Sequence, residues 1–166
     1  MTNAISGSRR GLRTATAIGA VTLGLTALTA CEKPTPLTTM TVGRDTVTTE
    51  AACYEDGKDL EDKVAAKCTE EKPDETITVG DADKLRVGVE PDMAEAGWMV
   101  FADDEPLLSE PTDKTYRSFS GETLFQQRDP STGQAMPPKK SATLRVIMTE
   151  DGKFKGVWII KAKRAK

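Results

Sequence analysis

Apolar and polar residues alternate with a period of two through most of the chain after residue 36. The segments that carry this pattern are rich in Thr, Val and Ile, and turn residues interrupt them at intervals that suit a β-sandwich. The strongest signal joins 142–149 to 154–162 through 150–153, where Asp151-Gly152 supplies the positive-φ pair that a tight hairpin requires. In the second strand two sets of side chains alternate: Trp158, Ile160 and Ala162 on one face, and Ile159, Lys161 and Lys163 on the other. We therefore expect a terminal hairpin that is half-buried, with one face against the core.

Six shorter segments show the same alternation. The run 98–102 is the most apolar and is followed by acidic residues at 103–105, so we expect a central strand and then a solvated turn. Residues 120–140 are a long polar loop with three prolines, of the kind that is either mobile or functional. The other strand candidates are 38–42 and 46–49, which form a hairpin around 43–45, then 76–79 and 85–89 on either side of a turn at 80–84, and finally 115–119.

One segment, 58–67, has apolar side chains on a helical stripe, and it lies between Cys53 and Cys68. Taken together, the elements predict an all-β fold: an immunoglobulin-like β-sandwich of about seven to eight short antiparallel strands, with one short helical segment bracketed by a disulfide. The likeness to immunoglobulins is architectural, because the Cys-Trp-Cys spacing of antibody domains is absent, and a small barrel is the alternative. We expect a core that includes Trp98, Phe101, Val146 and Trp158.

The first thirty residues have the composition of a bacterial export signal. Arg9, Arg10 and Arg13 form a charged region, and 14–27 is an apolar stretch that is too short and too rich in Thr, Ala and Gly to span a bilayer. It ends at Leu28-Thr29-Ala30-Cys31, which resembles the lipobox of bacterial lipoproteins, in which the cysteine thiol accepts a diacylglyceryl group. An ordinary secretory signal with a chance cysteine, or a short buried helix, is the alternative.

This pattern predicts three parts of the chain: a lipoprotein signal peptide over 1–30, a lipidated tether over 31–36 and a single β-sandwich domain over 37–166. Two prolines in the tether disfavour helix. The export route has two candidates, because Arg9-Arg10 is similar to the twin-arginine motif while paired arginines are also common in general secretory signals. Both routes deliver the domain to the same side of the membrane.

The three cysteines fit an exported protein. With Cys31 acylated, Cys53 and Cys68 remain as an even pair in an oxidising compartment, and we expect them to form a disulfide. Closing a loop of about 15 residues stabilises a fold by roughly 3 kcal/mol on the chain-entropy model. A metal or redox pair is the alternative, although the close C-x-x-C spacing and a histidine partner are both missing.

Composition and net charge exclude several classes of catalytic site, metal site and partner. The chain contains no histidine, which excludes Ser-His-Asp and Cys-His catalysis, His-ligated zinc and axial-His haem. Its formal charge is −3 and becomes −6 without residues 1–30, so we expect no nucleic-acid partner. We expect no cofactor and no metal, because the acidic clusters at 55–59, 81–83 and 103–105 lack the ligand spacing of a known calcium loop and suit solvated turns.

Two further groups of residues are candidates for function. Ser109, Ser118 and Ser120 lie near Lys114 in sequence, which permits a Ser-Lys pair, but no framing motif accompanies them. We interpret the C-terminal run first as an edge strand that lysines protect from aggregation, and the alternative is a partner surface for anionic lipid headgroups or wall polymers. Such an edge is also where a partner strand would add. The basic residues of this run are Lys161, Lys163, Arg164 and Lys166.

Four features resemble a family of small actinobacterial lipoproteins: the lipobox, the Cys-Glu-Lys-Pro-Thr-Pro start at 31–36, the stretch from Thr46 to Tyr54 and the Gly-Val-Trp strand from Gly156. The resemblance implies a cell-envelope location and no assigned activity. We therefore expect a lipid-anchored protein on the extracytoplasmic face of the cell membrane, acting as a non-enzymatic interaction or accessory module with an envelope protein or wall polymer as partner. A small-ligand or metal-ion carrier is the alternative, and a hydrolase comes third.

Overall fold

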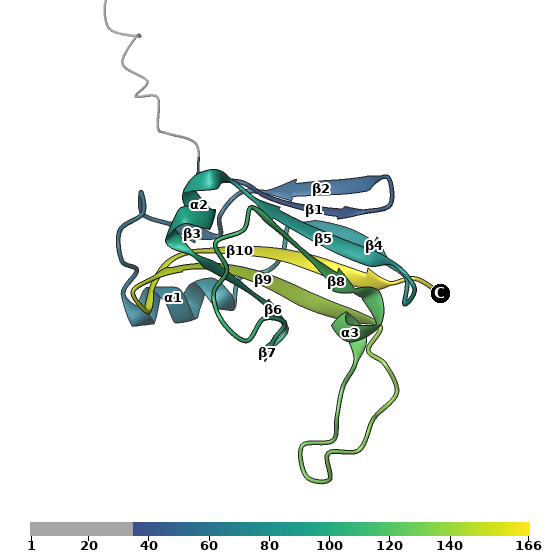
Figure 1. Ribbon diagram of the computed structural model, residues 1–166. Coiled ribbons are helices and arrows are strands. Elements are labelled where there is room, and N and C mark those ends of the chain that lie inside the picture. Colours follow the sequence, from purple (N-terminus) through teal and green to yellow (C-terminus); the bar gives the residue numbers. More distant parts are fainter. Residues whose placement is uncertain (1–34) are drawn as a thin grey trace, which may run out of the picture. The chain divides into compact units, whose positions relative to one another are not determined.

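The computed structural model describes residues 35–166, within the compact unit Pro34–Lys166. The predicted signal peptide, the predicted lipidation site Cys31 and the first part of the predicted tether therefore lie outside the described residues. The described chain is mainly β, and its two sheets pack face to face as an open sandwich (Figure 1). This confirms the predicted all-β sandwich.

One sheet, called sheet A here, has four antiparallel strands in the order β2-β1-β5-β8. The predicted first hairpin is confirmed, and Gly43 in its turn takes a positive φ of 58° that favours glycine. Strand β8 pairs only with β5 and forms one edge of the sheet. The bounds are β1 (Thr38–Val42), β2 (Asp45–Thr49), β5 (Lys84–Val89) and β8 (Tyr116–Ser120).

The other sheet, sheet B, has six strands in the order β3-β10-β9-β6-β7, and β4 pairs with β10 as well. The predicted terminal hairpin is confirmed: β9 and β10 are its arms, and Asp151 and Gly152 both take positive φ in its turn. The bounds are β3 (Cys53–Tyr54), β4 (Glu75–Val79), β6 (Trp98–Ala102), β7 (Glu105–Pro106), β9 (Ser141–Glu150) and β10 (Lys153–Arg164).

The place of β10 corrects one expectation. The strand lies inside sheet B, between β9 on one side and β3 and β4 on the other, so its C-terminal lysines do not protect an edge. Its partner over residues 160–164 is β4, in the single parallel pairing among the described strands. The hypothesis that a partner strand adds to β10 is therefore wrong, because the backbone groups of β10 already pair with neighbouring strands of the sheet.

Three short helices connect the strands of the described region: α1 (Asp62–Thr69), α2 (Pro91–Ala96) and α3 (Gly121–Phe125). The predicted helix at 58–67 is α1, displaced toward the second cysteine, whereas α2 and α3 were not expected. Pro91 opens α2, where its fixed φ suits the first helical turn. No helix in residues 35–166 is long and apolar enough to cross a membrane.

The predicted loop at 120–140 begins with α3 and then projects as two antiparallel arms (Figure 1). The arms are joined by backbone bonds, from Asp129 N–H to Gln134 O at 2.9 Å and from Met136 N–H to Gln127 O at 3.0 Å. The side-chain carboxylate of Asp129 also accepts from the Ser131 and Thr132 amides. The tip of the loop is thus held by its own hydrogen bonds.

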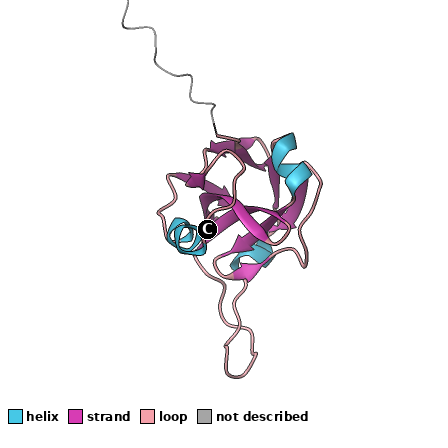
Figure 2. Cartoon of the chain, turned by 90° about the vertical axis from the view of Figure 1, so that its left-hand side faces the viewer, coloured by secondary structure: helices cyan, strands magenta, loops and turns pink. Residues whose placement is uncertain are grey.

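The main core fills the space between the sheets, and in the end-on view the strands enclose it (Figure 2). Trp98 and Trp158 are fully buried, and each indole N–H donates to a backbone carbonyl at 2.7 Å, of Lys114 and Pro36 respectively. Val146 is buried as expected, but Phe101 is not part of this core. The alternation of β6 turns Trp98, Val100 and Ala102 inward and Phe101 to the outer side of sheet B.

A second, smaller core lies on the outer side of sheet B, beneath α1. Val157 and Ile159 of β10 are buried there with Cys68, and Ala52, Cys53 and Val64 pack against them. Strand β10 is therefore buried on both faces along part of its length, which corrects the expectation of a half-buried strand. The cover that α1 provides is a tertiary contact that the pattern of one strand does not reveal.

Candidate functional site

The predicted disulfide is present, between Cys53 of β3 and Cys68 of α1, with Cα atoms 5.9 Å apart. It links the helix to the edge of sheet B, directly over the second core. Arg145 of β9 supports the same arrangement, because its Nε donates to the carbonyl of Thr69 at the end of α1 at 2.8 Å. The bond therefore serves the architecture, by holding α1 against the sheet.

The four basic C-terminal residues do not act as one group. Lys161 and Lys163 lie on the outer side of β10, where Lys161 is half-buried and Lys163 is exposed. Arg164 forms a two-point ion pair with Asp81, with Nε donating to Oδ1 at 2.7 Å and Nη2 bonding Oδ2. These hydrogen bonds hold the pKa of Asp81 below its usual value. Arg164 thus joins the turn after β4 to β10, and Lys166 is exposed at the chain end.

The acidic clusters take part in structural contacts. Asp103 accepts from the Lys139 ammonium at 2.6 Å and from the Thr143 amide at 2.8 Å. Burial raises the pKa of Asp103, but these two hydrogen bonds together with the positive charges of Lys139 and Arg145 leave the pKa below its usual value. Between residues 35 and 166, no cluster of three or more His, Cys, Asp or Glu could hold a metal ion.

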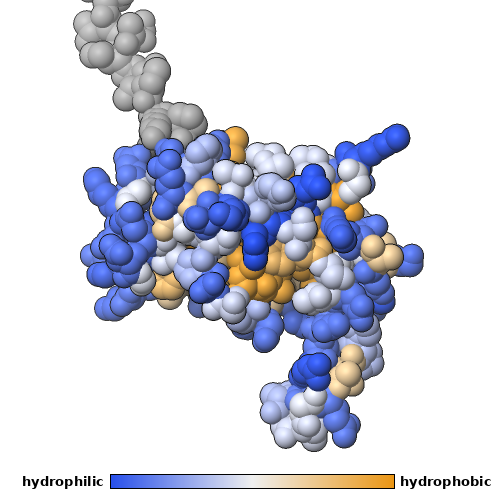
Figure 3. Space-filling view, viewed as in Figure 1, coloured by the Kyte–Doolittle hydropathy of each residue, from blue (hydrophilic) through white to orange (hydrophobic). Residues whose placement is uncertain are grey.

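Of the serine and lysine candidates, Ser118 and Lys114 line the same depression beside β8. Ser109 and Ser120 are not among its lining residues. Ser118 and Ser120 lie on the outer side of β8, and Lys114 pairs with Asp113 at 3.1 Å. This depression has a volume of about 460 Å³ and a mixed lining, in which Lys114, Arg117 and Ser118 accompany Leu107, Leu108 and Phe119. Figure 3 shows apolar side chains gathered on this face, where the sandwich is open between the edges β8 and β7.

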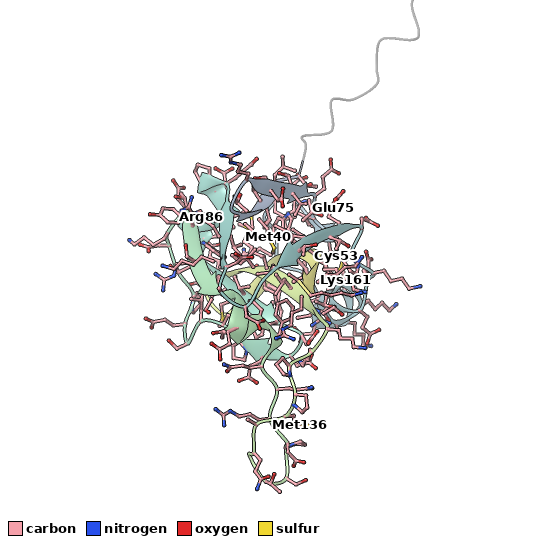
Figure 4. All side chains as sticks on the ribbon, turned by 90° about the vertical axis from the view of Figure 1, so that its right-hand side faces the viewer. Met40, Cys53, Glu75, Arg86, Met136 and Lys161 are labelled. Atoms are coloured by element: carbon pink, nitrogen blue, oxygen red, sulfur yellow. A yellow bond between two sulfur atoms is a disulfide. The ribbon has the colours of Figure 1, made fainter. Side chains whose placement is uncertain are left out.

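The outer face of sheet A is the feature that sequence reasoning missed. Its ten outward positions carry seven hydroxyl groups, two cations and one glycine, with no carboxylate and no aliphatic side chain. Figure 4 shows Arg86 on this side, with Met40 in the interior and Lys161 on the opposite flank. The ten residues are Thr39, Thr41, Thr46, Thr48, Lys84, Arg86, Gly88, Tyr116, Ser118 and Ser120.

Strand register arranges eight of these residues in two rows across the sheet, and Lys84 pairs with Ser120 in a third. One row runs through Thr46, Thr41, Arg86 and Ser118, and the next through Thr48, Thr39, Gly88 and Tyr116. Threonine hydroxyls of β1 and β2 bond to each other within each row, Thr41 to Thr46 at 3.2 Å and Thr39 to Thr48 at 3.1 Å. In every such pair one hydroxyl proton is used and the other stays available to a ligand.

At the β8 end, the two rows meet in an aromatic and cationic pair. The Arg86 guanidinium lies over the Tyr116 ring, 5.8 Å from its centre, and Tyr116 is 59% exposed. The individual strands show this face in their Thr-x-Thr, Lys-x-Arg-x-Gly and Tyr-x-Ser-x-Ser alternation. What sequence reasoning lacked was the strand order, since β1, β2, β5 and β8 become neighbours only in the fold.

No family model, curated protein or solved structure matches this chain.

Proposed function

We propose that this chain is an exported, lipid-anchored cell-envelope protein whose β-sandwich acts as a non-enzymatic interaction module. The observation that carries the proposal is the Cys53–Cys68 disulfide, because structural disulfides form and persist in oxidising, extracytoplasmic compartments. The arginine-rich start and the small residues before Cys31 supply the matching export signal and the acceptor for the lipid. The domain then lies on the extracytoplasmic face of the membrane.

The contacts of the charged side chains support an interaction module over an enzyme. Asp81, Asp103 and Lys155 all have ion-pair partners that join separate parts of the fold: Asp81 pairs with Arg164, Asp103 with Lys139, and Lys155 with Asp59 and Glu150. A catalytic carboxylate or lysine needs a perturbed environment in a cleft together with convergent polar groups. These side chains instead hold turns and strands together.

The packing of the interior bears on the carrier alternative. A carrier of the expected kind binds its ligand in a pocket between the sheets, and large side chains fill that space here. Those that are fully buried include Trp98, Trp158, Phe125, Met40 and Leu85. The interaction module therefore accounts better for the packed interior, with contact surfaces on the outside of the sandwich.

Replacement of the lipid acceptor tests the proposal. The full chain with its own leader is expressed in a bacterial host, as wild type and as Cys31→Ala, and membrane and soluble fractions are compared with incorporation of labelled palmitate. We expect wild-type protein in the membrane fraction with label, and Cys31→Ala without label and no longer retained. The matched control is the Cys53→Ala/Cys68→Ala double variant, which keeps the acceptor and should still be labelled.

Two outcomes contradict the proposal. Unchanged membrane retention of Cys31→Ala would show that the sulfur is not the anchor. Free thiols at Cys53 and Cys68 in the purified wild-type protein, measured by mass spectrometry without reducing agent, would remove the evidence for an oxidising compartment.

A further inference from the structure

The charge of the outer face of sheet A differs from that of the chain as a whole. The chain has 26 acidic and 23 basic residues, whereas the ten outward positions have Lys84 and Arg86 and no carboxylate. A positive, hydroxyl-rich surface on a protein of negative net charge complements an anionic ligand. The two cations are adjacent outward positions of β5, in the middle of the face.

Gly88 is not required by the fold. Its φ lies outside the left-handed region, and a Cβ built on it meets only the carbonyl oxygens of Thr115 and Thr39, each at 3.8 Å. Gly156 is the contrast, because a Cβ there would lie 2.6 Å from the Trp158 ring. A glycine in a strand interior weakens the strand and often marks a place where a ligand approaches the backbone closely.

The missing side chain leaves a gap between a threonine and a tyrosine. Along its row Gly88 lies between Thr39 and Tyr116, so a chain lying across the strands passes over bare backbone and meets the exposed phenol ring. Arg86, in the adjacent row, brings its guanidinium to the same ring. Each row spans three strand spacings, about 14 Å, enough for several sugar units of an extended polymer.

We propose that the outer face of sheet A binds an anionic polysaccharide. A sugar ring packs over Gly88 and against Tyr116, its carboxylate or phosphate group pairs with Arg86 and Lys84, and threonine hydroxyls of β1 and β2 bond its hydroxyl groups. The inference rests on the proposed function, because it is the proposed location in the cell envelope that places this face near wall polysaccharide.

Other anionic partners fit the face less well. Two cations on a chain of net charge −3 are too few for nucleic acid, which needs a dense basic surface. A lipid surface is bound through apolar side chains next to the basic ones, and the ten outward positions have no aliphatic residue. An acidic protein would pair with the cations but would leave the glycine gap and the hydroxyl rows unused.

Binding to a defined polymer tests the proposal. The full chain, purified in a neutral detergent, is titrated by calorimetry with polygalacturonate, with uncharged dextran and with poly-L-glutamate. We expect binding to polygalacturonate that weakens as salt is raised, and much weaker binding to the other two. Equal or tighter binding of poly-L-glutamate would show that charge alone is recognised and would overturn the assignment to a sugar polymer, as would no binding of polygalacturonate.

Substitutions on the face locate the site. Gly88→Val fills the gap and should weaken binding about tenfold or more, and Tyr116→Ala should do the same by removing the ring. Arg86→Gln should weaken binding about fivefold and reduce its salt dependence. Gly88→Val suits a strand, so its melting temperature should equal or exceed that of the wild type, which separates lost binding from lost folding.

The matched control is on the opposite flank. Lys161→Gln removes one positive charge from the outer side of sheet B and should change affinity less than twofold. Full affinity in both Gly88→Val and the smaller second variant Gly88→Ala would overturn the proposal. A loss of affinity in Lys161→Gln that equals the loss in Arg86→Gln would overturn it as well. These measurements use purified protein, so their outcome is independent of whether Cys31→Ala is retained in the membrane.

Discussion

The two outer faces of the sandwich differ in composition: part of the sheet B face is apolar and lies beneath α1, whereas the sheet A face is polar. On sheet B, the outward positions of β10 include Val157 and Ile159, and the chain covers them with α1. On sheet A, every outward position within the strands is a hydroxyl, a cation or a glycine. A sheet face is covered where it is apolar, because exposed apolar area costs roughly 25 cal/mol per Å².

The cover on sheet B also has to be held in place. Helix α1 is 8 residues long, which is too short to be stable alone in water, so its position depends on tertiary contacts. The disulfide fixes one of its ends to β3, and Arg145 binds the carbonyl at its C-terminus. The contrast between the faces therefore predicts large effects of substitution on the sheet B side and small ones on sheet A.

The largest expected effect is loss of the disulfide. The Cys53→Ala/Cys68→Ala double variant should lose about 3 kcal/mol of unfolding free energy, because the bridge closes a loop with a sequence separation of 15. Urea denaturation of both proteins under non-reducing conditions measures this loss. Hydrogen exchange should show the amides of α1 losing protection before those of β9, since the helix is the element that the bridge holds.

A double substitution on sheet A provides the control. Thr39→Val/Thr48→Val replaces one exposed hydroxyl pair by residues that suit strands, and we expect a change within about 0.5 kcal/mol. A loss similar to that of the cysteine variant would contradict the difference between the two faces.

The next largest effect concerns Arg145 of β9, which binds the C-terminal end of α1. Arg145 donates to the carbonyls of Thr69 and Asp103, and its side chain is only 20% exposed. Arg145→Met keeps most of the packing of the stem but leaves both carbonyls without this donor, and should cost about 2 kcal/mol. Arg86→Met on sheet A should cost less than about 0.5 kcal/mol, because Arg86 is exposed. Equal losses in the two variants would refute the assignment of a structural role to Arg145 alone.

The contrast between the faces also shows how far sequence reasoning reaches. The β9–β10 hairpin and the first hairpin were predictable, because their strands are adjacent in sequence and their turns contain glycine at a positive φ. The disulfide followed from cysteine parity. These features depend on local chemistry or on counting.

Contacts between distant segments were not predictable in the same way. The parallel pairing of β4 with β10 joins residues 75–79 to 160–164, and no local signal encodes it. Ile159 appeared to face solvent because the cover from α1 comes from another part of the chain. The ten residues of the outer face of sheet A were visible as alternation in single strands, but their common surface depends on strand order.

A third prediction uses pH to compare a half-buried carboxylate, Asp103, with an exposed one. The pKa of Asp103 is lowered in the folded state, so its contribution to stability is present above the unfolded pKa and is lost as the pH falls through the folded one. Asp103→Asn should therefore flatten the decline in unfolding free energy below about pH 4, and should cost about 1 kcal/mol at pH 7. Denaturation curves at several pH values measure both effects.

The control for this pH effect lies next to sheet A. Asp113 pairs with Lys114 in an exposed ion pair, and the hydrogen bond from Lys114 lowers its pKa as well. Because solvent screens this pair, Asp113→Asn should leave the pH profile of stability unchanged. A profile for Asp113→Asn that matches the one for Asp103→Asn would show that the pairing of Asp103 with Lys139 and Thr143 has no special weight.

The smallest expected effect is a gain, and it concerns the one glycine on sheet A. Gly88→Ala should raise the unfolding free energy by about 0.5 kcal/mol, because alanine restricts the unfolded chain and its Cβ meets only ordinary contacts at 3.8 Å. The same substitution at Gly156 should destabilise, since its Cβ would collide with the Trp158 ring. Thermal denaturation of the two variants measures the difference in sign. A destabilised Gly88→Ala would mean that the fold itself requires this glycine, and the gap beside Tyr116 would then need no ligand to explain it.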